Sequence, residues 1–353
     1  MLASGSECGV TDAVQPSEAM LDRPLRPSTG GVLRHLTRAL AGALVSLAFV
    51  VMLGFLLFRV LPGDPVLTRT RGRPVGAQQI AELRERLGLD RPLPGQFVDY
   101  LRDLLRGDLG TSYKFQRPVT ELIAQRIGPT LLLVGTATVI AVLLGFGQGS
   151  RAAWRRGSWF DRTSVGVALT LWSTPPFWLG LIVLLVFAGG VGPLPGLFPT
   201  RGIVSPDGSL PVALDVAYHL VLPCLTLVAA IYAQYLLVMR ASLLEETGAE
   251  YLTTARAKGL RDDDVRRKHA VPNALLPTVT LVFLHLGLVV SGAITVETVF
   301  SWPGLGLLVY EALTVPDLPL LQGTFVVICA AVIVMNLVAD LLYRVLDPRL
   351  RPS

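Results

Sequence analysis

Charged residues are scarce in this sequence. Asp, Glu, Lys and Arg make up 16% of its 353 residues, whereas a soluble domain usually contains about 25%. Hydrophobic residues make up 52%, and they form long runs instead of alternating with polar residues. Such runs are typical of membrane-spanning segments. The composition therefore argues against a soluble globular protein.

Cysteine and histidine are also rare, with three of the first and four of the second. Cys8, Cys224 and Cys329 lie far apart, and none of these residues has the spacing of a disulfide framework or a metal site. The sequence also lacks a G-x-x-x-x-G-K-S/T segment, the loop that holds phosphates in P-loop ATPases. We therefore predict a protein that is not an enzyme and that binds no metal or cofactor itself.

The net charge of +5 would also suit a protein that binds nucleic acid. The basic residues, however, lie in short segments between the apolar runs, where they set the orientation in the membrane and contact lipid headgroups. We therefore expect this chain to contact membrane lipid and no nucleic acid.

Six apolar runs are each about 20–25 residues long, enough for a helix to cross a hydrocarbon core of about 30 Å. They are residues 39–60, 130–149, 164–188, 218–239, 276–298 and 323–344. The predicted fold is all-α, a polytopic membrane protein with six transmembrane helices. Its expected parts are a disordered tail over 1–31, a first helix over 32–60, an external segment over 61–129, a five-helix core over 130–345 and a second tail over 346–353.

The distribution of Lys and Arg predicts the orientation of these helices. The two terminal segments and segments 150–163 and 240–275 together carry 18 of them, whereas 189–217 and 299–322 carry only Arg201. Segment 61–129 carries 11, but loops longer than about 60 residues do not follow the positive-inside rule. Both termini are therefore expected in the cytoplasm.

The long external segment shows two stretches of helical periodicity, Gln78 to Gly88 and Gly95 to Gly107, separated by prolines. In the second stretch one face carries only apolar residues, namely Phe97, Leu101, Leu104 and Leu105. We expect two amphipathic helices at the outer membrane surface.

The cytoplasmic loop over 241–275 mixes charges of both signs. Seven basic and six acidic residues lie between Arg240 and Ala270. The residues from Glu250 to Lys258 favour a short helix that ends at Gly259, and three aspartates then favour the start of a second helix. A docking surface for a protein partner and an ordinary solvated loop are both consistent with this pattern.

Several motifs in this sequence occur in the same order in one transporter family. They are PGDP at 62–65, LGLDRP at 87–92, GDLG at 107–110, PPFW at 175–178, TARAKGL at 254–260, ETVFSWPGLG at 297–306 and DPR at 347–349. Gly259 is followed after nine residues by His269-x-Val271-Pro272, the spacing of the EAA loop. The chain thus resembles binding-protein-dependent ABC importer permeases of the dipeptide/oligopeptide/nickel subfamily, specifically the first permease of a pair. The Glu-Ala-Ala triplet of the wider family reads Thr253-Thr254-Ala255 here.

This resemblance implies a type I permease in a bacterial plasma (inner) membrane that imports di- or oligopeptides by alternating access. It also implies a second homologous permease, one or two cytoplasmic ATPase subunits that bind ATP and Mg, and an external substrate-binding protein. The coupling contact with the ATPase is expected at ten residues of the loop. They are Glu250, Thr254, Ala255, Arg256, Ala257, Lys258, Gly259, Leu260, His269 and Pro272.

Five residues within or beside the apolar runs are candidates for the pathway or its external mouth. They are Glu297, Trp302, His285, Phe177 and Trp178. Structural interpretations compete with four of them: a turn with an interfacial tryptophan at Trp302, a hydrogen-bonded core histidine at His285, and a proline-broken helix with packed aromatic residues at Phe177 and Trp178. From their depth alone, Asp340 and Arg240 could form an ion pair.

Three alternative functions differ in class or cargo. A secondary transporter would use paired ionisable residues at the membrane midplane of repeated halves, and a membrane enzyme would use a convergent set of catalytic groups. We find neither pattern in the sequence. A permease for nickel complexes or another small solute is the alternative within the same subfamily.

Overall fold

The computed structural model describes the backbone of residues 29–60, 76, 78, 91–189, 196–206, 208 and 210–346. For residues 29–35, 59–60, 276–278, 280, 283–292 and 342–346 it describes the backbone alone. The expected tail up to residue 28, the expected helix over 78–88 and the last seven residues lie outside this description. Within the described residues the structure is helical, apart from one isolated β-bridge between Thr111 and Pro118.

Every apolar run of the sequence lies within a helix or a pair of helices. In chain order the elements are α1 (Thr29–Val60), α4 (Leu93–Leu105), α5 (Val119–Trp154), α6 (Trp159–Ser173), α7 (Pro176–Phe187), α8 (Val212–Glu246), α9 (Glu250–Ala257), α10 (Asp262–Val265), a π-helical turn η2 (Arg266–Ala270), α11 (Val271–Val299), α12 (Leu305–Thr314) and α13 (Leu318–Leu346). Among the fully described residues, four helices are long and apolar enough to cross a membrane, and the bent pair α6 and α7 provides a fifth such segment.

The α6–α7 pair is broken where the sequence predicts it. The two helices meet at an angle of 104°, and Thr174 between them is extended, with φ −87° and ψ 125°. Pro175 and Pro176 follow directly, and a proline disfavours the helical conformation of the residue before it and removes a backbone donor. The expected single span over 164–188 is therefore two helices that point in different directions.

The most extensive contact between the described helices joins α5 and α8, and glycine makes it possible. A Cβ on Gly145 would lie 2.5 Å from the Cβ of Tyr235, and one on Gly149 would lie 2.6 Å from the carbonyl oxygen of Leu236. Small residues four apart let two helix backbones approach in a membrane. The two helices form the centre of the largest apolar cluster, which also includes residues of α6, α7 and α11.

The first helix lies at the edge of the molecule and packs on α13. Phe58 of α1 meets Phe325 of α13 edge to face, with ring centroids 6.1 Å apart. The helix α4, in the segment expected outside the membrane, rests on α1 through Phe55, whose ring lies 5.2 Å from Phe97 and 5.7 Å from Tyr100. The expected amphipathic helix is thus present, but Leu105 on its expected apolar face is 80% exposed.

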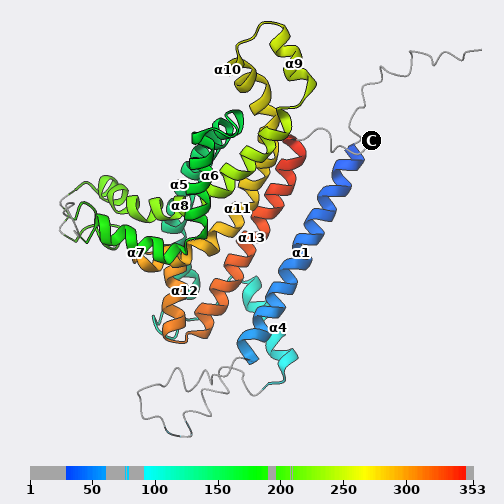
Figure 1. The fold of residues 1–353 in the computed structure, drawn as a ribbon. Helices are drawn as coiled ribbons and strands as arrows, with labels where there is room; N and C mark the ends of the chain where they lie inside the picture. The colour runs from blue at the N-terminus through cyan, green and yellow to red at the C-terminus, as the bar shows by residue number, and fades with distance from the viewer. Residues whose placement is uncertain are drawn as a thin grey trace, which may run out of the picture.

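Figure 1 shows that the helices divide into two ends. The helices α9 and α10 lie at the same end as the first turn of α1 and the last turn of α13. The helices α4 and α12 lie at the opposite end, and α7 extends to one side. The long helix α5 connects the two ends, since its first residue Val119 packs near α12 and its last residue Trp154 contacts α10.

Candidate functional site

The short helix α9 ends in the way its sequence predicts. Gly259 has a φ of +83°, in the left-handed region that glycine adopts without steric penalty. Its N–H donates to the carbonyl of Arg256 at 2.9 Å, and the N–H of Leu260 donates to that of Ala255 at 3.4 Å. These two bonds form a Schellman motif, which terminates the helix and turns the chain toward α10.

The aspartates after this turn occupy the first turn of α10, where the helix dipole favours negative charge. They also pair with basic residues of η2: Asp263 lies 3.0 Å from Arg266, and Asp264 lies 3.0 Å from Lys268. The predicted N-cap role is not seen, because Arg261 takes the cap position and no side chain caps the helix.

One face of the α9–α10 hairpin is anchored to the rest of the chain. Leu252 and Val265 are fully buried and Ala255 is 6% exposed. They pack with Met239 and Leu243 of α8 and with residues of α5 and α11. The hairpin is therefore fixed to the ends of three long helices by apolar contacts.

The opposite face of the hairpin is mostly exposed and carries most of the predicted coupling residues, although Arg256 on this face contacts Trp154 and Asp262. Glu250, Thr254, Arg256, Ala257, Lys258, Gly259, Leu260 and Pro272 are exposed, whereas His269 is half-buried. Ala255 faces the interior, so the structure separates it from the others. At the base of α9, Tyr251 donates a hydrogen bond to Glu246, and burial together with this bond raises the pKa of the Tyr251 phenol.

Trp154, a residue that the sequence analysis did not select, ties this hairpin to α5. Its Nε1 donates to Oδ2 of Asp262 at 2.6 Å. The guanidinium of Arg256 lies 5.5 Å from the centre of the Trp154 ring and 3.4 Å, measured from Nε, from Oδ1 of Asp262. A tryptophan at the end of an apolar run reads as an interfacial anchor, so the sequence offered no specific signal for this contact.

Arg240 pairs with a different acid from the one suggested by depth. Its Nε and Nη2 donate to the two carboxylate oxygens of Asp161 at 2.7 and 2.9 Å. Asp161 also accepts from the N–H of Gly157 at 2.9 Å. Asp340 is exposed, so the suggested Arg240–Asp340 pair is wrong. The sequence could not rank the two acids because they lie at similar depth in different helices.

The turn after α11 is built around Glu297, which is fully buried. Its carboxylate accepts from the hydroxyl of Thr130 at 2.7 Å and from the N–H of Gly306 at 2.6 Å. The indole N–H of Trp302 donates to the carbonyl of Pro129 at 2.9 Å. Both candidates for the external mouth are therefore engaged with the chain itself, where they fasten the start of α12 to α5.

The remaining pathway candidates differ from this pair. Phe177 and Trp178 follow the α6–α7 break and are 49% and 53% exposed. The helix break is present, but these two aromatic side chains are not packed in the apolar core, contrary to the alternative interpretation of a broken helix with packed aromatic residues. The side chain of His285 lies outside the described residues. Among the described residues, no group of three or more His, Cys, Asp or Glu is placed to hold a metal ion.

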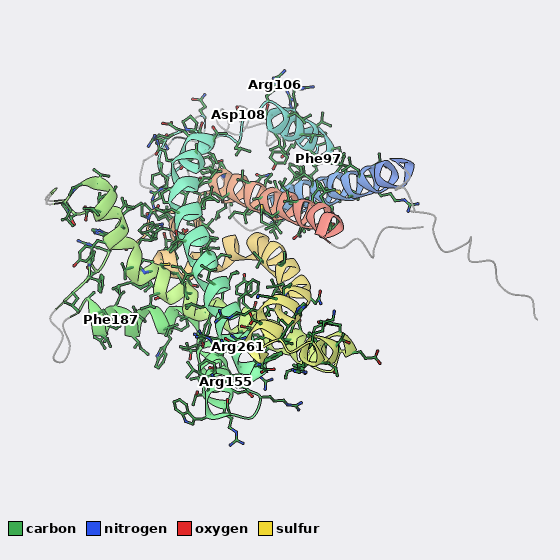
Figure 2. All side chains as sticks on the ribbon, turned by 90° about the horizontal axis from the view of Figure 1, so that it is seen from above. Phe97, Arg106, Asp108, Arg155, Phe187 and Arg261 are labelled. Atoms are coloured by element: carbon green, nitrogen blue, oxygen red, sulfur yellow. The ribbon has the colours of Figure 1, made fainter. Side chains whose placement is uncertain are left out.

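Figure 2 places the hairpin contact in the whole molecule. Arg155, next to Trp154, and Arg261, next to Asp262, lie at one edge of the view from above. Phe97, Arg106 and Asp108 of the external segment lie at the opposite edge. The contact between α5 and the hairpin is therefore remote from the external helix α4.

Comparisons with known proteins give one consistent result. Residues 128–352 match the family described as "Binding-protein-dependent transport system inner membrane component", and residues 32–134 match its N-terminal component. The chain is 36% identical over 339 residues to the dipeptide transport system permease protein DppB of Escherichia coli K12, with 91% of this chain and 99% of that protein covered. It is 38% identical over 321 residues to the glutathione transport system permease protein GsiC of Pectobacterium atrosepticum, with 91% and 99% covered.

Proposed function

The chain belongs to the family of binding-protein-dependent transport system inner membrane components, and from this premise we propose that it is the permease subunit of a peptide importer driven by a separate ATPase. The observation that carries the proposal is the two-faced α9–α10 hairpin. One face packs on α5, α8 and α11, and the other displays the predicted coupling residues. A force applied to the exposed face would therefore reach three long helices.

The arrangement proposed in the membrane has six spans: α1, α5, the broken pair α6 and α7, α8, α11 and α13. It is supported by the position of the hairpin, the start of α1 and the end of α13 at one end of the molecule (Figure 1). That end carries the excess of basic residues and is assigned to the cytoplasm. The three segments expected outside the membrane, 61–129, 189–217 and 299–322, are proposed to receive the substrate-binding protein. Of these, α4 and α12 lie at the opposite end (Figure 1).

The mechanism proposed is alternating access. ATP-driven closure of one or two partner ATPases, which bind ATP and Mg, moves the hairpin and shifts the permease between outward- and inward-facing states. A second, homologous permease completes the pore. This chain contributes no phosphate-binding loop, so its part in the cycle is mechanical.

The cargo proposed is a di- or oligopeptide. Support comes from the two relatives, whose names state dipeptide and glutathione transport. Phe177 and Trp178 are proposed pathway residues, because exposed aromatic side chains at a break in a membrane helix lie where irregular backbone borders a cavity or a partner. Proteoliposomes with all subunits should accumulate a labelled dipeptide when ATP is inside. ATP-independent uptake that follows an ion gradient would instead identify a secondary transporter.

Gly259 allows a sharp test of the docking surface. Nothing in the described chain lies within 4 Å of a Cβ built on it, and its φ is positive. Gly259→Ala strains the backbone and adds little bulk, whereas Gly259→Asn tolerates this φ and adds more bulk. If the ATPase approaches closely, the Asn variant should lose ATPase association and uptake at least as severely as the Ala variant. Normal association and uptake in the Asn variant would contradict docking at this residue.

A further inference from the structure

We infer that Trp154 is a positioning residue that locks the α9–α10 hairpin to α5, so that movement of the hairpin is transmitted to α5. The inference rests on the proposed function, since it concerns how movement caused by the ATPase passes from the hairpin to α5. It assigns a role to a residue outside the coupling loop itself.

The first support is the geometry around Trp154. Its indole N–H reaches Asp262 at 2.6 Å, and its ring face lies 5.5 Å from the guanidinium of Arg256. Arg256 belongs to α9 and Asp262 to α10. A single side chain of α5 therefore holds both helices of the hairpin, through a charge-assisted hydrogen bond and a cation–π contact.

The second support is the directional character of this contact. The hydrogen bond from Tyr251 to Glu246 is also directional, but it joins the hairpin to α8 and not to α5. Leu252, Ala255 and Val265 hold the hairpin to the helix ends by apolar packing, which has no directional preference. The hydrogen bond from Trp154 to Asp262 is directional. It fixes the rotation of the Gly259 turn relative to α5, and this is the part of the hairpin that is exposed to a partner.

The third support is the connection of α5 to the rest of the molecule. Gly145 and Gly149 bring its backbone into direct contact with α8. At its other end Thr130 donates to the carboxylate of Glu297 and accepts from the N–H of Leu305. A displacement at Trp154 therefore acts on a helix that is fastened along its length, and α5 would carry it to the start of α12.

The test uses the assembled transporter, with ATPase activity measured with and without the loaded binding protein. Trp154→Phe and Asp262→Ala should each lower the stimulated rate by about fivefold while the ATPase still copurifies. The double variant should lose no more than Asp262→Ala alone, because that change already removes the hydrogen bond from Trp154 together with the exposed Arg256–Asp262 pair. Asp263→Ala is the matched acidic control, since Asp263 pairs with Arg266 and not with Trp154. Trp159→Phe is the matched aromatic control, since Trp159 is 79% exposed. Equal rates in variants and controls would overturn the inference.

A second measurement separates this inference from the proposed function. Spin labels at Arg151 of α5 and Lys258 of the hairpin, in the full chain without native cysteines, report their separation independently of any ATPase. The distance distribution should be narrow in the parent chain and broader in Trp154→Phe. An unchanged width would overturn the inference even if the variants fail to assemble. A wild-type complex without any stimulation, in contrast, would contradict the proposed function and leave the distance measurement to decide on Trp154.

Discussion

The two ends of α5 are held by different kinds of contact. Toward its first turns, α5 contacts Glu297, which is fully buried and whose carboxylate is shared by Thr130 and by backbone N–H groups of α12. At the other end, Trp154 meets Arg256 and Asp262, both of which are exposed. The Glu297 turn is thus closed by the chain itself, whereas the hairpin keeps one face open.

This difference indicates where each end meets its partner. Buried hydrogen bonds to a carboxylate are costly to break and favour one arrangement. Exposed ion pairs such as Asp264–Lys268 contribute little to stability, so the hairpin can exchange them for contacts with another protein at small cost while the Trp154–Asp262 hydrogen bond stays in place. We therefore expect changes at the Glu297 turn to act on folding, and changes on the open face of the hairpin to act on coupling.

The largest effect is expected at the closed end. Glu297→Ala would leave the N–H groups of Gly306 and Leu307 and the hydroxyl of Thr130 without their acceptor. Each such group costs about 1–3 kcal/mol when it is left buried without a partner, so the loss for the three together should be about 3–9 kcal/mol. Thermal unfolding of the solubilised transporter measures it. Glu245→Ala, at an exposed position, should leave the midpoint unchanged. Equal midpoints for the two variants would show that the buried Glu297 carboxylate contributes no more to stability than an exposed one.

The next largest effect is expected in the middle of α5. Gly145→Ala would place a methyl group 2.5 Å from the Cβ of Tyr235, and overpacking of this kind typically costs about 1–3 kcal/mol. Gly135→Ala on the same helix meets nothing within 4 Å and should be neutral. The midpoint of unfolding should fall for the first variant alone. Comparable midpoints would show that α5 and α8 are less closely packed than described.

A smaller effect is expected where α6 meets α8. Asp161→Asn weakens the two-bond contact with Arg240. It should destabilise the chain by about 1.5 kcal/mol, the lower end of the range for hydrogen bonds to charged groups, because the amide oxygen still accepts one of the two bonds. Asp340→Asn is the control, because depth alone pairs this acid with Arg240 but the structure leaves it exposed. If Asp340→Asn lost stability and Asp161→Asn did not, the result would support an Arg240–Asp340 pair and contradict the Arg240–Asp161 pair.

The smallest effect is expected on the open face. Lys268 lies 3.0 Å from Asp264, and the two side chains are 67% and 38% exposed. Lys268→Gln should change the free energy of unfolding by less than about 0.5 kcal/mol, as for other exposed i,i+4 pairs. The same unfolding assay measures it. A shift as large as that of Asp161→Asn would show that this face is not free to exchange its ion pairs.

Much of the fold could be predicted from sequence because its causes are local. The apolar runs correspond to helices, the prolines at 175–176 break one of them, and Gly259 ends α9 with a positive φ. Each of these depends on composition or on backbone preferences of single residues. The predicted helix ends were less accurate. The structure begins α5 at Val119, whereas the apolar run from which the helix was predicted begins at residue 130.

The parts that could not be predicted depend on contacts between distant segments. Trp154 and Asp262 are 108 positions apart, and Thr130 and Glu297 are 167 apart. Neither pair has a spacing that marks it in one sequence. The burial of Ala255 was missed for a related reason: the loop pattern shows which residues are small, but the face that packs depends on α8 and α5.

The central claim is that the open face of the α9–α10 hairpin receives the ATPase. Site-specific photo-crosslinking in the assembled transporter tests it most directly, with the crosslinker at Lys258 of the hairpin or at Leu197 in segment 189–217, which is expected outside the membrane; both residues are exposed. The account predicts a crosslink to the ATPase subunit from Lys258 and none from Leu197. A crosslink from Leu197, or none from Lys258 in a complex that hydrolyses ATP, would contradict it.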